Sequence, residues 1–112
     1  MARVSELCRE IVAEELERLD DGRLDLVTVT HLEVEPDLRH ATVYYSALGR
    51  DEEAAGDALA KNRIHLQAAI ARQARLKRTP ELVFRVDEVI RTGARVEEIM
   101  RQMRAERGEE TP

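Results

Sequence analysis

The sequence predicts an α+β fold in which helices cover a three-stranded sheet. Apolar residues recur at helical spacing in four segments, and three shorter segments alternate apolar with polar residues as strands do. The predicted order of elements is α-β-β-α-kink-α-β-α. Because the chain has 112 residues and one cysteine, we expect a single domain over residues 1–107 without disulfides. A polar, disordered tail is expected over residues 108–112.

The first half of the chain is predicted to form a helix followed by a β-hairpin. Apolar residues over 4–19 step by three and four, as in an amphipathic helix. Two antiparallel strands are predicted over 24–35 and 40–47, joined by a turn that contains Pro36. The apolar residues of the first strand change face near Thr30. This change indicates either a β-bulge or a sheet that is covered on both faces.

The second half is predicted to begin with two helices separated by a kink. The strand breaks at residues 48–50, and Asp51 can cap a helix that starts at Glu52. A second helix is expected over 63–77, before Pro80 forces an extended conformation. Apolar spacing across Asn62 departs from the helical rhythm, which favours a kink there over one straight helix.

A third strand and a last helix complete the predicted fold. Apolar and polar residues alternate over 81–86, and Asp87 can cap the helix that follows. The apolar residues of this helix are expected to face the core: Val89, Val96, Ile99, Met100 and Met103.

Charge is distributed unevenly along the chain. The segment 58–80 contains six Lys or Arg residues and no Asp or Glu, so its formal charge is +6. The whole chain carries −5, which leaves −11 for the remainder. A local positive surface on an acidic body attracts phosphates, although a merely solvated helix face would show the same composition.

The sequence gives no support for an enzyme, a cofactor or a metal site. It contains no glycine-rich phosphate loop, and its three histidines and one cysteine lack the spacing of zinc ligands. Apolar runs are too short to cross a membrane. Aromatic residues are scarce, which argues against a platform on which bases stack. The best physical hypothesis is binding of nucleic-acid phosphates through a helix–helix junction, as in KH modules, although the GXXG loop of those modules is absent.

Two stretches carry a resemblance to a known family. They read LVTVTHLEVEPDLRHATVYYSALG over 26–49 and RLKRTPELVFRVDEVIRTGARVEEIM over 75–100. In this order and spacing they make the chain similar to bacterial ribosome-binding factor A, over roughly residues 3–103. The resemblance implies a type-II KH-like fold in which a helix-kink-helix replaces the GXXG loop. Members often have Ala-x-Gly at the kink, whereas this chain has Asn62-Arg63-Ile64.

The resemblance also implies a function. It indicates a cytoplasmic assembly factor that binds the free 30S subunit or its precursor and assists late maturation of 16S rRNA, including its 5′ end. It implies importance for growth in the cold, and it makes an assembly GTPase a candidate partner that no residue here identifies. We expect a monomer that binds no membrane, because the apolar stripes suffice for about one core.

The residues predicted to contact RNA are the cations of the basic segment, with Asn62 at the kink. We expect phosphate contacts from Lys61, Arg63, Arg72, Arg75, Lys77 and Arg78, with Arg85 on the strand behind them as a weaker candidate. The alternative is a protein–protein adaptor whose basic helix docks on an acidic partner. A nuclease is disfavoured, because the sequence shows no clustered carboxylates.

Overall fold

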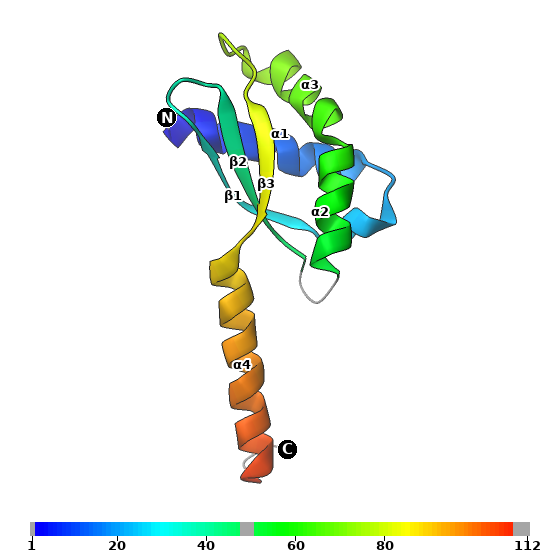
Figure 1. Cartoon of the computed structure of the whole chain (residues 1–112), viewed down its shortest axis with the longest axis vertical. Coiled ribbons are helices and arrows are strands. Elements are labelled where there is room, and N and C mark those ends of the chain that lie inside the picture. Colours follow the sequence, from blue (N-terminus) through cyan, green and yellow to red (C-terminus); the bar gives the residue numbers. More distant parts are fainter. Residues whose placement is uncertain (1, 48–50, 109–112) are drawn as a thin grey trace.

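The computed structural model describes residues 2–47 and 51–108 and confirms the predicted order of elements (Figure 1). The elements are α1 (Ala2–Arg18), the short 3₁₀ helix η1 (Gly22–Leu24), β1 (Thr28–Val34), β2 (His40–Ser46), α2 (Glu52–Lys61), α3 (Arg63–Ala74), β3 (Glu81–Val86) and α4 (Glu88–Glu106). The predicted break at 48–50 and, apart from Gly108, the predicted tail over 108–112 lie outside the described residues.

The sheet has the strand order β1-β2-β3. Strands β1 and β2 form the predicted antiparallel hairpin, in which the Glu35 N–H donates to the His40 carbonyl at 2.9 Å. Strand β3 runs parallel to β2. Parallel neighbours need a long crossover connection, and the α2–α3 pair supplies it. The helix pair is therefore held beside the sheet by the topology of the chain.

Strand β1 contains the bulge that the sequence indicated as one alternative. The register shifts between Val29 and His31, so Val29 and Leu32 both point into the core. The strand starts at Thr28, four residues later than predicted. The reason is that Gly22–Leu24 forms η1 and Leu26 has φ of 67°, a conformation that interrupts an extended chain.

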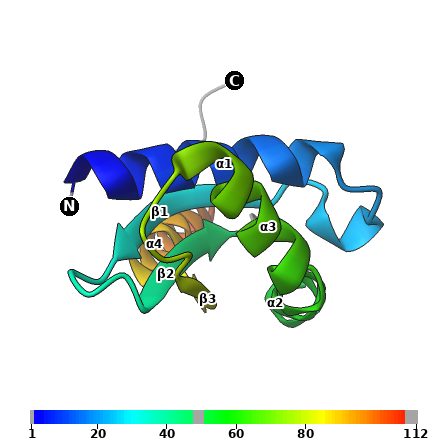
Figure 2. The ribbon, with the colours of Figure 1, turned by 90° about the horizontal axis from the view of Figure 1, so that it is seen from above.

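The core lies between the sheet and the helices α1, α2 and α3, which gather on one side of the strands (Figure 2). Helix α1 packs along β1 and α3, and the Ser5 hydroxyl accepts a hydrogen bond from the Val34 N–H at 3.0 Å. Cys8 is completely buried in this core, as its place on the apolar stripe of α1 predicts.

Helix α3 ends earlier than predicted. It stops at Ala74, because Arg75 adopts the left-handed conformation with φ of 51° and ψ of 42°. A left-handed residue terminates a helix, and here it turns the chain back toward the buried Pro80, which directly precedes β3. Lys77 and Arg78 consequently lie in the connecting loop and not in a helical turn.

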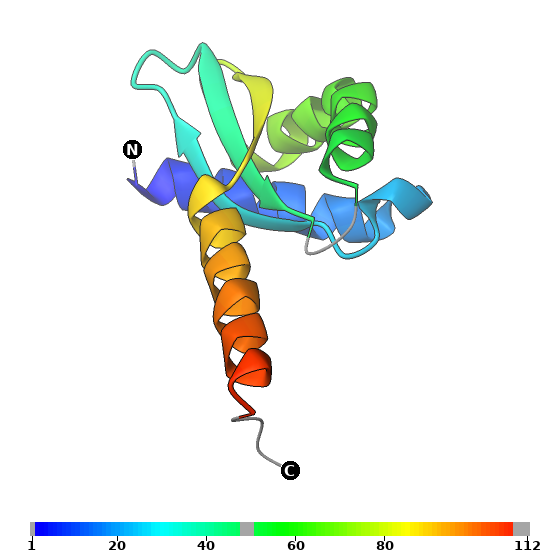
Figure 3. The same cartoon turned by 60° about the horizontal axis from the view of Figure 1, so that its bottom comes forward.

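The prediction that α4 packs on the core is wrong. No residue of α4 is buried, and the exposed fractions of Val89 and Met100 are 80% and 53%. The helix leaves the body at the end of β3 and extends away from it (Figures 1 and 3). Asp87 caps its first turn as predicted, and Arg91 Nη1 in the same turn lies 3.2 Å from Glu52 Oε2. The core-facing positions are already filled by α1, α2 and α3.

Candidate nucleic-acid interface

The predicted kink at Asn62 is present and separates α2 from α3. Asn62 has φ of −97° and ψ of 9°, outside helical values, and its side-chain amide donates to the Ala58 carbonyl at 2.8 Å. Its own carbonyl accepts from the Leu66 N–H at 3.0 Å. The chain therefore changes direction at one residue, and Asn62 keeps hydrogen bonds to both helices.

The N-terminus of α3 has no side-chain cap. Helices α2 and α4 begin with Asp51 and Asp87, whose carboxylates accept from first-turn N–H groups, whereas Asn62 turns its side chain back onto α2. The first-turn N–H groups of α3 thus receive no negative side chain from the residue before the helix. A helix N-terminus of this kind carries partial positive charge and favours a bound anion.

Two of the predicted cations flank this uncapped end. Lys61 is exposed at the end of α2, and Arg63 opens α3. Arg63 Nη1 lies 4.0 Å from Glu81 Oε1, and both side chains are about half exposed, so this ion pair is weak. We call Lys61, Arg63 and the first turn of α3 the junction site.

Contacts that the sequence did not reveal fix the orientation of α3. His65 Nε2 lies 2.8 Å from Oε1 of the buried Glu15 on α1. On the side of the sheet, Gln67 Oε1 accepts from the Leu82 N–H of β3 at 2.9 Å. The sequence held one signal for the contact between α1 and α3. Glu15 lies on the apolar stripe of α1, and a buried carboxylate needs a polar partner.

The other four cations of the basic segment form a second group at the opposite end of α3. Arg72 lies in the last turn, Arg75 ends the helix, and Lys77 and Arg78 follow in the loop. All four are exposed, and within the described residues none of them makes an ion pair. We call these four residues the loop group.

The structure does not bring all predicted cations onto one surface. Arg63 and Arg72 are nine residues apart in one helix, which places them about 180° apart around its axis and about 13 Å apart along it. Arg85 lies elsewhere again. Its neighbours Leu82 and Phe84 alternate with it toward the core, so Arg85 points from the sheet face opposite α1 and α3.

Acidic groups lie close to the junction site. The pKa of Asp21 is lowered to about 2, chiefly by the hydrogen bonds from the Arg23 side chain and backbone N–H, with a smaller contribution from the charge of Lys61. Helix α2 packs against η1, so the acidic turn before η1 borders this helix.

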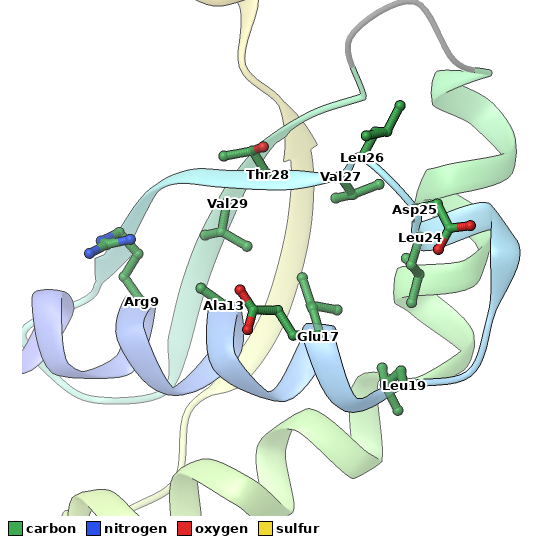
Figure 4. A pocket seen from close by; sticks show the side chains of 11 residues that line it. Arg9, Ala13, Glu17, Leu19, Leu24, Asp25, Leu26, Val27, Thr28 and Val29 are labelled. Carbon is green, nitrogen blue, oxygen red and sulfur yellow. The ribbon is translucent and has the colours of Figure 1, made fainter.

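A pocket of about 400 Å³ lies away from these cations, between α1 and residues 24–29 (Figure 4). Apolar side chains such as Leu16, Leu24 and Val29 line it together with Arg9, Glu17 and Asp25, and it includes none of the predicted RNA contacts. Over the described ranges 2–47 and 51–108, no cluster of three His, Cys, Asp or Glu residues could hold a metal ion. In the same ranges, no helix is long and apolar enough to cross a membrane.

Comparison with known proteins assigns the family. The sequence profile of ribosome-binding factor A matches residues 1–100. The chain belongs to this family. Curated relatives named ribosome-binding factor A include those of Rubrobacter xylanophilus, 44% identical over 103 residues, and Gemmatimonas aurantiaca, 40% identical over 114 residues. These alignments cover 90% and 98% of this chain, and 84% and 78% of the relatives.

Solved structures of ribosome-binding factor A share this fold. The crystal structure of the Thermus thermophilus protein has a TM-score of 0.72 and 36% identity, covering 76% of this chain and 93% of the other. A homology model of the Thermus thermophilus protein, fitted into a cryo-electron microscopy map of a complex between the 30S subunit and ribosome-binding factor A, has a TM-score of 0.66 and 36% identity. The match covers 77% of this chain and 93% of the Thermus chain.

Proposed function

We propose that this member of the ribosome-binding factor A family binds the free 30S subunit, or its precursor, and contacts 16S rRNA phosphates at the junction site. The observation that carries the proposal is the uncapped N-terminus of α3 between Lys61 and Arg63. Family membership and the fit of the Thermus relative into a map of a 30S complex support it. In this role the protein assists late 16S maturation, including processing of the 5′ end, in the cytoplasm and without catalysing a reaction.

The junction site binds phosphate by two physical effects. First-turn N–H groups of α3 point at the anion and donate hydrogen bonds to it, and the helix dipole adds attraction. Lys61 and Arg63 neutralise further charge and release counterions from the RNA. Asn62 is important because its amide bonds to Ala58, which leaves those N–H groups for the ligand.

The loop group extends the contact along the RNA. If all six cations of the basic segment met single-stranded phosphates, the slope of log affinity against log salt would approach about −4. Because Arg63 and Arg72 lie on opposite sides of α3, the RNA must pass around the helix or supply two separate segments. The acidic remainder of the chain limits non-specific RNA binding and favours release.

Co-sedimentation with purified 30S, 50S and 70S particles tests the proposal. The wild-type protein is expected to pellet with 30S, and Lys61→Glu/Arg63→Glu is expected to lose that binding. The loop-group variant Arg72→Glu/Arg75→Glu/Lys77→Glu is expected to bind more weakly and with a shallower salt slope. A control with the same charge change as the junction variant, Arg95→Glu/Arg104→Glu on α4, is expected to bind normally.

Other results would point elsewhere. If the wild type and both charge-reversal variants bound 30S equally well, the contact with RNA would lie on another surface of the protein. Absence of binding to every particle would refute the assembly function and favour an adaptor that docks on an acidic protein. If the α4 control lost 30S binding to the same extent as the junction variant, the loss would be due to the change in net charge and not to the junction site.

A further inference from the structure

The sheet face opposite α1, α2 and α3 is open. Along β3, Leu82 is completely buried, whereas Glu81, Val83 and Arg85 on the alternate positions are exposed. Figure 2 shows the helices of the body together on the other side of the strands. Helix α4 leaves from the end of β3 and has no buried residue, so it does not seal this face.

Three planar side chains form a row across the open face. His31 pairs with Tyr44 between β1 and β2, and Tyr44 pairs with Arg85 between β2 and β3. The rings of His31 and Tyr44 are stacked, with centroids 5.8 Å apart and an angle of 28° between their planes. The three residues lie on three different strands, so the sequence alone does not show that their side chains are neighbours.

The β-bulge creates the row. Without the register shift between Val29 and His31, strict alternation from the buried Val29 would turn His31 into the core. The extra residue, Thr30, is anchored because its hydroxyl donates to Asp87 Oδ2 at 2.5 Å. A fixed irregularity therefore holds His31 out against Tyr44.

The chemistry of the row suits a base better than a run of phosphates. Among the described strand residues of this face, Arg85 is the one guanidinium, and Glu33 and Glu81 on the same face would repel phosphates. Nucleobases are planar and uncharged, and they stack on tyrosine, histidine and arginine side chains. We infer that His31, Tyr44 and Arg85 bind an unpaired base of single-stranded RNA, which stacks on the Tyr44 ring beside the Arg85 guanidinium.

This inference rests on the proposed function and adds a second contact to it. The junction site binds phosphates on the helical side of the sheet, and the row binds a base on the other side. It also changes the role of Arg85 from a phosphate contact to part of a stacking surface. The low overall number of aromatic residues argued against such a surface, but one tyrosine placed between histidine and arginine is sufficient for one base.

Tyrosine fluorescence provides a direct test. The chain has no tryptophan and two tyrosines, and Tyr45 is only 5% exposed, so quenching by a ligand reports on Tyr44. Titration with a single-stranded oligoadenylate is expected to quench the emission, whereas an abasic ribose-phosphate oligomer of the same length is expected to leave it unchanged.

Variants separate stacking from charge. Tyr44→Leu is expected to weaken oligoadenylate binding by roughly 5- to 100-fold with an unchanged salt slope, because the phosphate contacts remain. Tyr44→Phe keeps the ring and is expected to bind within about 3-fold of wild type, which also controls for folding. Equal affinity of wild type and Tyr44→Leu, or the absence of quenching, would overturn the inference.

Pelleting with 30S distinguishes this inference from the proposed function. Quenching by oligoadenylate without any pelleting would support the row and refute the proposed function. Pelleting with 30S without quenching by oligoadenylate would agree with the proposed function and would refute base binding by His31, Tyr44 and Arg85. If Tyr44→Leu lost 30S binding while RNA left the emission unchanged, the open face would contact a protein, and the inference would be overturned.

Discussion

Asp21 shows how a single, partly buried carboxylate organises the turn that borders the junction site. Its side chain caps η1 by accepting from the Arg23 N–H at 3.0 Å, and it also accepts from the Arg23 guanidinium, with Nη2 at 2.8 Å. These bonds favour the ionised carboxylate, which lowers the pKa of Asp21 from 3.8 to about 2. These bonds, together with the buried side chain of Leu24, fix the turn.

The titration of Asp21 can be measured directly by NMR. Because the folded pKa lies below the ordinary value, the stabilisation is fully present above about pH 4 and is lost as the pH falls through about 2. In Arg23→Ala, the pKa is expected to rise toward 3.8 but to stay below it, since the backbone N–H of residue 23 still donates. An unchanged midpoint in this variant would show that Arg23 is not the cause.

At the scale of single elements, two helical glycines test what packing adds to propensity. A Cβ on Gly56 in α2 would lie 2.7 Å from the hydroxyl oxygen of the buried Tyr45, which donates to the Glu52 carbonyl at 3.3 Å. A Cβ on Gly93 in α4 would meet nothing within 4 Å. Gly56 therefore makes room for the Tyr45 hydroxyl, whereas Gly93 only weakens its helix.

Alanine at the two positions is expected to act in opposite directions. Gly56→Ala gains about 1 kcal/mol of helix propensity but incurs about 1–3 kcal/mol of overpacking, so we expect a lower free energy of unfolding in urea. Gly93→Ala gains about 1 kcal/mol of propensity without a clash, and we expect more helical ellipticity. Higher stability of Gly56→Ala would show that Tyr45 moves aside freely.

The elements themselves were largely predictable from the sequence. Local signals decided them: Asp51 and Asp87 are caps, Asn62 interrupts a helical rhythm, and the change of apolar face near Thr30 marks the bulge. Each of these signals lies within a few residues of the structural feature that it predicts. The end of α3 was missed, because the left-handed Arg75 is imposed by the return of the chain to the sheet and not by its own preference.

The arrangement of the candidate site was only partly predictable. The sequence identified the cations, and the nine-residue spacing of Arg63 and Arg72 already implied opposite sides of a helix. The uncapped start of α3 and the row of His31, Tyr44 and Arg85 depend on side-chain direction and strand register. Neither follows from composition or periodicity.

At the scale of the whole molecule, the position of α4 decides the shape. The Cα radius of gyration is 17.0 Å and the extents are 59 × 29 × 21 Å, whereas a compact domain of this length has a radius of about 13 Å. Apolar periodicity defines an apolar side of α4, but it wrongly predicted that the core covers that side. The core was already complete without it.

Small-angle X-ray scattering tests this shape in solution. We expect a radius of gyration near 17 Å with a forward scattering that matches a 12.8 kDa monomer. A value near 13 Å would show α4 folded back onto the body. Forward scattering that matched twice this mass would contradict the predicted monomer.

The nearly isolated position of α4 also affects how the protein unfolds. Its 19 residues are only slightly longer than the ~12–15 at which helices without tertiary support become marginal in water. Fraying of α4 is therefore a separate equilibrium from the cooperative loss of the core. Far-ultraviolet ellipticity should begin to fall before the environment of Tyr45 changes, so a melting curve that monitors helix content describes two processes, and its midpoint belongs to neither.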